Sequence, residues 1–201
     1  MADQKISAMP SASTPLTGAE LVPLIQSGAN VQSTLANFGA YARTAFSNYG
    51  SFEDTGAAQT TTANTVTNVR INTTSYAVGM TRNALNSTIA VTTAGIYSVI
   101  ISVQLSNSSS NYDDCTLWPT INGANVANSA SVVEIPAKKG NVDGLTILTV
   151  QYTLSLNASD YVGFKWISEG GTASILTIPA SLSAPIHPAA AGVILSIIQV
   201  A

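Results

Sequence analysis

The stretch Ile96-Tyr-Ser-Val-Ile-Ile-Ser-Val-Gln-Leu105 alternates between two kinds of position. The even-numbered residues include two serines and a glutamine, whereas the odd-numbered residues are all apolar: Tyr97, Val99, Ile101, Val103 and Leu105. Successive side chains of a β-strand point to opposite faces of a sheet, so a period of two places one set against a core. The stretch therefore predicts a half-buried antiparallel strand.

A second stretch, Leu145 to Leu156, repeats this alternation, with one apolar face formed by Leu148, Val150, Tyr152, Leu154 and Leu156. Shorter strand candidates lie at 64–71, 75–80, 88–92, 115–121, 131–135, 161–168, 173–178 and 191–200. Turn-forming residues such as Asn122-Gly123 separate them. About ten strands of this kind predict a mainly β fold, an antiparallel jelly-roll sandwich over residues 61–201.

The chain before this region has a different pattern. Two short β-like pieces, at 21–26 and 31–35, flank a glycine-containing turn and predict a hairpin. Apolar residues spaced three or four apart from Leu35 to Phe46 predict a short amphipathic helix capped by Ser33 or Thr34. We therefore expect an N-terminal segment over 1–50, a Gly- and Thr-rich linker over 51–60, and the sandwich over 61–201.

The last strand candidate is apolar on both of its faces. Val193, Leu195 and Ile197 occupy one face, and Ile194, Ile198 and Val200 occupy the other. If the first face fills the core, the second leaves roughly 300 Å² of apolar surface, near the size that marks an interface. We expect Ile194, Ile198 and Val200 to form an oligomer interface; the alternative is that the Pro-rich segment 179–190 of the same chain covers them.

The composition excludes several classes of function. Only 8% of the residues are charged, against about 25% in an average soluble domain. The net charge is −3 and the seven Lys and Arg residues form no basic stripe, so neither nucleic-acid binding nor attraction to a membrane is expected. We also expect synthesis in a cytoplasm without a signal peptide, and no membrane insertion, because no long apolar run occurs.

Residues that could carry catalysis or hold a metal are few. His187 is the only histidine and lies between prolines, and Cys115, the only cysteine, lies in a strand candidate beside Trp118. We expect both to be structural, and the protein to be neither an enzyme nor dependent on a cofactor; a jelly-roll esterase or glycan hydrolase using His187 is the alternative. The adjacent Asp113 and Asp114 could hold a cation, although calcium needs six to eight oxygen ligands.

Two aromatic residues near polar loops are candidates for contact with a glycan. Tyr112 lies near the end of the loop 107–114, which is rich in Ser and Asn, and Trp118 follows this loop. By the alternation of their strand, Phe164 and Trp166 share one face and are expected in the core, while Tyr161 points the other way.

Residues 60–200 resemble a known family of jelly rolls. Thr93-Ala-Gly-Ile-Tyr-Ser-Val-Ile-Ile-Ser-Val103 is similar to the "Gly-x-Tyr-x-apolar" strand of tumour-necrosis-factor-like and complement-head domains. Leu154-Ser-Leu-Asn-Ala-Ser-Asp-Tyr-Val-Gly-Phe164 is similar to their "Leu…Gly-Asp-x-Val" strand pair, with Ser159 in place of the glycine. The resemblance implies a ten-stranded jelly roll and a homotrimer, with the closing strand 192–200 near the trimer axis.

Residues 4–35 resemble the N-terminal motif of bacteriophage tail-fibre, tailspike and other virion appendage proteins. The matching runs are Lys5-Ile-Ser-Ala-Met-Pro10 and Leu16-Thr-Gly-Ala-Glu-Leu-Val-Pro-Leu-Ile-Gln26. The resemblance implies attachment to other virion proteins, of the tail or the capsid, through Ile6, Leu16, Leu21, Val22, Pro23, Leu24 and Ile25. No long fibre shaft separates this motif from the sandwich.

These observations predict a structural component of a bacteriophage particle. It would be a short trimeric tail-fibre, knob or adaptor appendage, located in the virion, that docks by its N-terminus and exposes a jelly-roll head. The alternatives are a capsid decoration or head-fibre protein, and a receptor-binding module for a glycan of the host surface.

Overall fold

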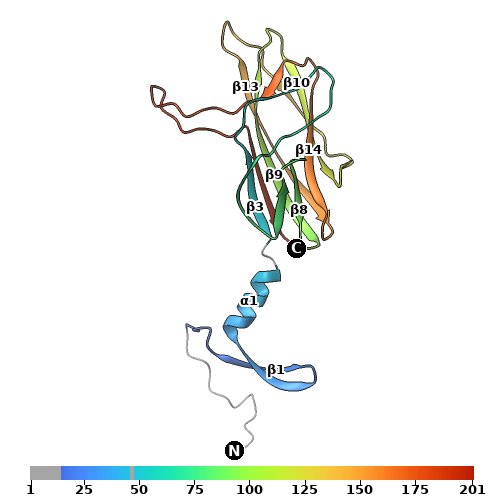
Figure 1. Cartoon of the computed structure of the whole chain (residues 1–201), viewed down its shortest axis with the longest axis vertical. Coiled ribbons are helices and arrows are strands. Elements are labelled where there is room, and N and C mark those ends of the chain that lie inside the picture. The colour runs from blue at the N-terminus through green and yellow to red at the C-terminus, as the bar shows by residue number, and fades with distance from the viewer. Residues whose placement is uncertain (1–14, 46–47) are drawn as a thin grey trace, which may run out of the picture. The chain divides into compact units, whose positions relative to one another are not determined.

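A computed structural model describes residues 15–45 and 48–201 (Figure 1). The chain divides into two compact units, residues 1–46 and residues 47–201. The predicted boundary near residue 50 thus lies about four residues too late.

The N-terminal unit consists of a hairpin followed by a helix. Strands β1 (Leu21–Gln26) and β2 (Ala29–Thr34) pair antiparallel from Leu21↔Thr34 to Gln26↔Ala29. The two turn residues, Ser27 and Gly28, have φ of 51° and 80°, which is the twist that tight hairpins favour. Helix α1 (Leu35–Ala45) follows directly, and the Asn37 amide donates to Thr34 Oγ1 at 3.2 Å. The predicted hairpin, helix and Thr34 cap are all confirmed.

The second unit is an antiparallel sandwich of two sheets. The first, called the β9 sheet, has its five long strands in the order β6 (Thr73–Val78), β3 (Tyr49–Asp54), β16 (Val193–Gln199), β9 (Gly95–Asn107), β13 (Gly144–Leu156). The short strands β15 (Ala173–Ile175) and β4 (Gln59–Thr60) extend it beside the end of β9.

The second sheet, called the β14 sheet, has the order β7 (Met80–Asn83), β8 (Thr88–Val91), β14 (Tyr161–Ser168), β10 (Asp113–Ile121), β12 (Ser131–Ile135). The short strands β5 (Thr67–Asn68) and β11 (Ala124–Asn125) pair with β14 and β10.

The predicted fold class is confirmed as a mainly β, antiparallel sandwich. The structure has sixteen strands instead of about ten. Ten strands of four or more residues build the sandwich; the others are the N-terminal hairpin and four pieces of two or three residues. Such short pieces carry no periodicity from which a strand could be predicted.

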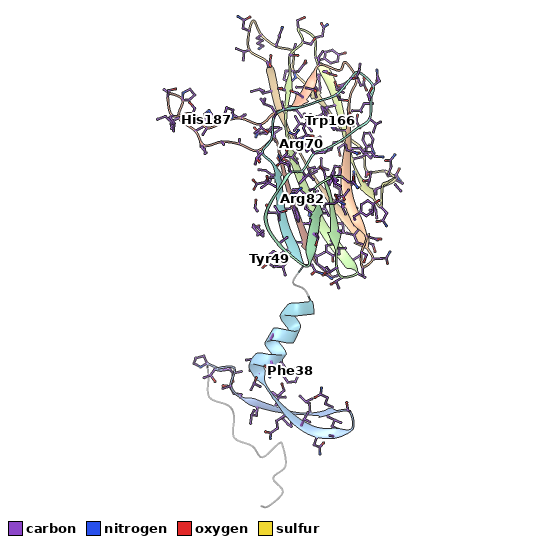
Figure 2. All side chains as sticks on the ribbon, viewed as in Figure 1. Phe38, Tyr49, Arg70, Arg82, Trp166 and His187 are labelled. Carbon is purple, nitrogen blue, oxygen red and sulfur yellow. The ribbon has the colours of Figure 1, made fainter. Side chains whose placement is uncertain are left out.

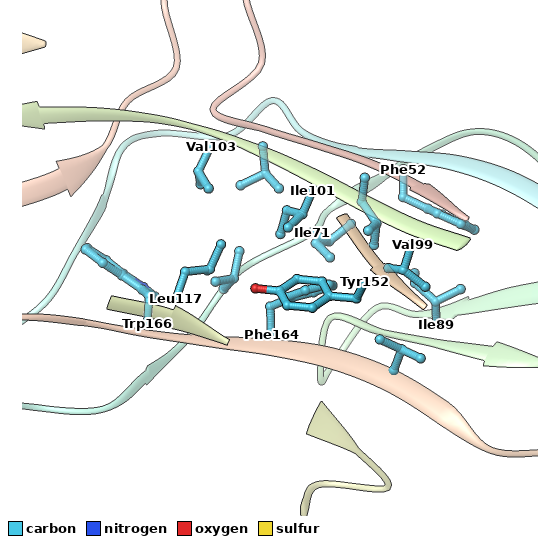
Figure 3. Close-up of a cluster of buried hydrophobic side chains, with 14 of the residues drawn as sticks. Phe52, Ile71, Ile89, Val99, Ile101, Val103, Leu117, Tyr152, Phe164 and Trp166 are labelled. Carbon is cyan, nitrogen blue, oxygen red and sulfur yellow. The ribbon is translucent and has the colours of Figure 1, made fainter. Parts of the chain in front are cut away.

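The core fills the space between the sheets, and the alternation of β9 and β14 is confirmed (Figure 3). Val99, Ile101 and Val103 from β9 face Phe164 and Trp166 from β14, and all five are buried. Each large apolar side chain buried in this way contributes about 1.5–3 kcal/mol. This core is what sets the outward direction of every second residue in both sheets.

The linker predicted at 51–60 is wrong, because these residues contain most of β3 and all of β4. The inward positions of β3 include Phe52 but also Asp54, and a charged inward residue hides the apolar alternation. Asp54 is fully buried because Arg70 holds it in a two-pronged ion pair, with Nε and Nη2 each donating to a carboxylate oxygen at 2.9 Å. Gln59 Nε2 donates to Asp54 Oδ2 at 2.8 Å as well. The residue that compensates the buried charge of this strand thus lies sixteen positions away.

Candidate functional site

The outer face of strand β16 is apolar and accessible. Val193, Leu195 and Ile197 point inward with no exposed area, as predicted. Ile194 and Ile198 point outward, each 48% exposed, and Val200 follows at 54%. The three residues predicted as an interface are therefore open on the isolated chain.

The neighbouring strands extend this face. Across the ladders, Ser196 lies opposite both Ile100 of β9 and Ser51 of β3, and Ile198 lies opposite Tyr49. The ring of Tyr49 in turn packs against that of Tyr76 on β6, with centroids 6.1 Å apart. We call this surface the isoleucine face; its exposed apolar members are Tyr49, Tyr76, Val78, Ile100, Leu145, Ile147, Ile194, Ile198 and Val200.

The isoleucine face is almost free of charge. The strands β6, β3, β16, β9 and β13 contain no Lys, Arg or His, and their acidic residues are Glu53 and the buried Asp54. The β14 sheet, by contrast, carries Arg82, Asp114, Glu134 and Lys165 in its strands. Depletion of charge distinguishes the centres of protein interfaces from the rest of a surface. The two sides of the sandwich are therefore unequal in charge, and the strands of the β9 sheet carry fewer charged residues.

The alternative covering of this face by residues 179–190 is wrong. Bridges at Ile178↔Ala190 and Ser181↔His187 fold this segment into an arm of its own. Figure 1 shows the arm projecting from the sandwich, and Leu182 and Ile186 on it are exposed. The arm leaves Ile194 and Ile198 uncovered.

The N-terminal unit shows no buried core within residues 15–40. None of the residues between 15 and 40 is buried. Among the predicted docking residues, Leu16, Leu21, Pro23 and Ile25 are exposed and Val22 and Leu24 are half-buried, while Ile6 lies outside the described residues. A hollow of about 330 Å³ lies between hairpin and helix, lined by Leu24, Ile25, Gln26, Val31, Gln32, Ser33, Asn37 and Phe38. An isolated two-stranded hairpin is marginally stable in water, so this unit offers apolar groups that a partner could bury.

The candidate catalytic residues lie far from a catalytic arrangement. His187 is half-buried on the arm (Figure 2), and its Nδ1 lies 3.0 Å from the Pro188 carbonyl oxygen. Cys115 is buried on β10, and burial together with the nearby Asp113 charge raises its pKa to about 12. A thiol with such a pKa is not a nucleophile at neutral pH. These positions agree with structural roles for both residues.

The two adjacent aspartates do not act together. Asp114 points outward and lies opposite Glu134 on β12, whereas Asp113 is buried. Five protein groups donate to the Asp113 carboxylate at 2.6–2.9 Å: Ser168 Oγ, Gly170 N, Thr172 N, Thr172 Oγ1 and Ala173 N. Burial raises the pKa of Asp113, but these hydrogen bonds lower it by a larger amount, so the pKa lies below its ordinary value. Within residues 15–45 and 48–201, no three His, Cys, Asp or Glu side chains gather as a metal site.

The two candidate glycan residues are not brought together. Tyr112 is exposed just before β10, and Trp118 lies six residues further along that extended strand, about 20 Å away at 3.3 Å per residue. Trp118 instead lines a hollow of about 320 Å³ with Thr116, Asn125, Val126, Asn128, Ser129 and Ala130. Its indole Nε1 donates to Asn125 Oδ1 at 3.0 Å.

Sequence reasoning missed several members of the isoleucine face. Tyr49 and Tyr76 belong to strands that were not predicted at their true positions, and Ile100 lies between two serines on the polar side of its strand. The signal in the sequence that could have indicated this face was Ile100, an isoleucine at a position expected to face solvent.

A scan against models of known protein families finds none that matches this chain, and a search of curated proteins finds no match. Among the described residues, no helix has the length and apolar character needed to cross a membrane.

Proposed function

We propose that this chain is a non-enzymatic structural protein that assembles as a homotrimer through the isoleucine face. The observation that carries the proposal is a five-stranded sheet face with exposed isoleucines and a single outward charge, Glu53. Burying roughly 300 Å² of apolar surface on each chain at about 25 cal/mol per Å² contributes several kcal/mol. The number of subunits rests on the resemblance to the trimeric tumour-necrosis-factor-like jelly rolls.

The proposed setting is a bacteriophage particle, in which the N-terminal unit docks and the sandwich is exposed. The resemblance of residues 4–35 to virion appendage proteins supports this setting. The lack of buried residues between 15 and 40 supports it as well, because such a unit gains order when a partner covers its apolar groups. Attachment to the tail as a knob or adaptor, and attachment to the capsid as a decoration or head fibre, are both compatible with these features.

Assembly is tested by replacing outward isoleucines in the full chain. Mass photometry of the unaltered protein is expected to give about three times the chain mass of 20.6 kDa. The double variant Ile194→Lys, Ile198→Lys is expected to be monomeric, because assembly would bury two uncompensated ammonium groups. Val132→Lys is the matched control, since Val132 is exposed on the other sheet. A monomeric unaltered chain, or a double variant that remains trimeric, would contradict the proposal.

Docking is tested by placing charge on the exposed hairpin. Leu21→Asp with Ile25→Asp is expected to remove the protein from purified particles while leaving its trimer and melting temperature unchanged, because both side chains are exposed. Immunoblotting of particles measures incorporation, and a reconstruction of the particle shows whether the unit lies on tail or capsid. Particles that incorporate the variant at the normal level would exclude this hairpin as the docking element.

A further inference from the structure

A small polar cavity lies on the outer face of the β14 sheet, on the sheet opposite the isoleucine face. Its volume is about 240 Å³, and its lining residues are Asn68, Asn86, Thr88, Thr120, Gly123, Tyr161, Gly163, Phe164 and Lys165. Gly163 forms the floor, because a Cβ at this position would lie 3.1 Å from both Thr120 Oγ1 and Thr88 Cγ2. Thr88 and Thr120 thus pack closely over Gly163 at this floor.

Most polar side chains that line this cavity have no hydrogen-bond partner among the described residues. The amides of Asn68 and Asn86 and the hydroxyls of Thr88, Thr120 and Tyr161 make no side-chain hydrogen bond with any other described residue. Thr120 is only 3% exposed as a whole residue, but its hydroxyl oxygen is not fully buried and can be reached from the cavity. Its oxygen borders the floor of the cavity, where a ligand could satisfy it.

The side-chain amides of two residues just outside the cavity, by contrast, already have hydrogen-bond partners. Asn122 Nδ2 donates to Asp160 Oδ1 at 2.7 Å, and Asn122 Oδ1 accepts from the Tyr161 amide at 3.0 Å. Asn125 Oδ1 accepts from Trp118 at 3.0 Å. The side chains of Asn122 and Asn125 are thus held by the chain itself, whereas those of Asn68 and Asn86 remain free to bind a ligand.

One cation borders the cavity without a carboxylate partner. Lys165 Nζ lies 3.5 Å from Asn125 Oδ1, and the one ion pair within the described residues joins Arg70 to Asp54. Since the lining contains no acidic residue, the cavity favours a ligand that brings its own negative charge.

We propose that this cavity binds one sugar residue of a glycan, and that it prefers a uronic acid over the matching neutral sugar. A sugar hydroxyl both donates and accepts, which matches amides and hydroxyls that do the same. The Tyr161 ring offers an apolar surface beside these polar groups, and Lys165 would pair with the carboxylate. A volume below the range of about 300–1,000 Å³ typical of drug-sized ligands fits one ring and not a long chain. This inference does not rest on the proposed assembly, because it uses the other sheet.

The test is an NMR titration of the full chain with methyl glucuronide and with methyl glucoside. Both are expected to shift the backbone amides of Thr88, Thr120 and Gly163 at millimolar concentration, with the glucuronide binding several-fold more tightly at low salt. Lys165→Gln is expected to equalise the two sugars without abolishing either. Tyr161→Ala and Asn68→Ala, two surface changes, are expected to weaken both at least tenfold.

Tyr112→Ala is the control, because Tyr112 is an equally aromatic, exposed residue outside the cavity. It is expected to bind as the unaltered chain does. Absence of binding at tens of millimolar overturns the proposal, as do shifts that centre on Trp118, or binding that survives in both Tyr161→Ala and Asn68→Ala. Equal affinity of the unaltered chain for both sugars overturns the uronic acid preference.

Discussion

At the scale of single residues, the charge of each of two buried aspartates is compensated by other residues of the chain. Asp54 is bound by Arg70 and Gln59, and Asp113 is bound by the turn that follows β14. A buried carboxylate costs several kcal/mol unless such groups compensate it. Each of these aspartates therefore fixes a segment that has little apolar content of its own: residues 54–70 in one case and residues 168–173 in the other.

Asp113→Asn is expected to lower the free energy of unfolding at pH 7 by about 3 kcal/mol, because an amide nitrogen would face groups that donate to the carboxylate. The pKa of Asp113 is below its unfolded value of 3.8. Its contribution is therefore fully present above that value and is lost as the pH falls through the folded pKa. Urea unfolding at pH 7 and at pH 3 measures both effects, and the difference between the unaltered chain and the variant should shrink at pH 3.

Asp114→Asn is the matched control for this experiment. Asp114 points outward opposite Glu134, and removing one of two like charges across a strand pair is expected to change stability by about 0.5 kcal/mol or less, in the stabilising direction. Equal losses in the two variants would contradict the role assigned to the buried carboxylate.

At the scale of elements, β16 carries buried apolar residues on one face and exposed apolar residues on the other. Its inward residues complete the core between β9 and β3, and its outward residues lie on the isoleucine face. The adjacent isoleucines 197 and 198 are chemically identical and differ only in the face they occupy.

Ile197→Ala is expected to destabilise the fold by about 2–5 kcal/mol, because it leaves a cavity in the core. Ile198→Ala, half-exposed on the isolated chain, is expected to cost less than about 1 kcal/mol in folding and to weaken assembly instead. Urea unfolding at a protein concentration low enough for the trimer to dissociate measures the first effect, and the concentration dependence of the molecular mass measures the second. Similar unfolding free energies for the two variants would contradict the assignment of faces.

At the scale of the whole molecule, the sandwich is closed where the beginning and the end of its chain meet. Asn48 Nδ2 donates to Gln199 Oε1 at 2.7 Å and to the Tyr97 hydroxyl at 3.2 Å. These contacts join residues as far as 151 positions apart. Because nearly all contacts between the strands are of this long-range kind, we expect the sandwich to unfold as one unit.

Cys115 reports on that unfolding. Its thiol is 1% exposed and has a pKa of about 12, so a thiol reagent at pH 8 is expected to label it only when the sandwich opens. The labelling rate should then follow global unfolding and rise steeply with urea. Chain unfolded in urea provides the fully reactive reference, and labelling of the native protein within seconds would contradict a buried thiol.

The sequence alone determined the strands β9, β13 and β14 from the alternation of their side chains and β16 from its apolar run, and with them the sandwich and the buried positions of Phe164 and Trp166. It also determined the hairpin and helix at the N-terminus, because their turn, cap and spacing are local signals. Strand β3 could not be predicted, because the charged Asp54 occupies one of its inward positions. Its burial is possible only because Arg70 forms an ion pair with it. The isoleucine face and the cavity over Gly163 were decided by the tertiary structure. Each is built from strands distant in the sequence, and the pairing of those strands is fixed by long-range packing that no local pattern records.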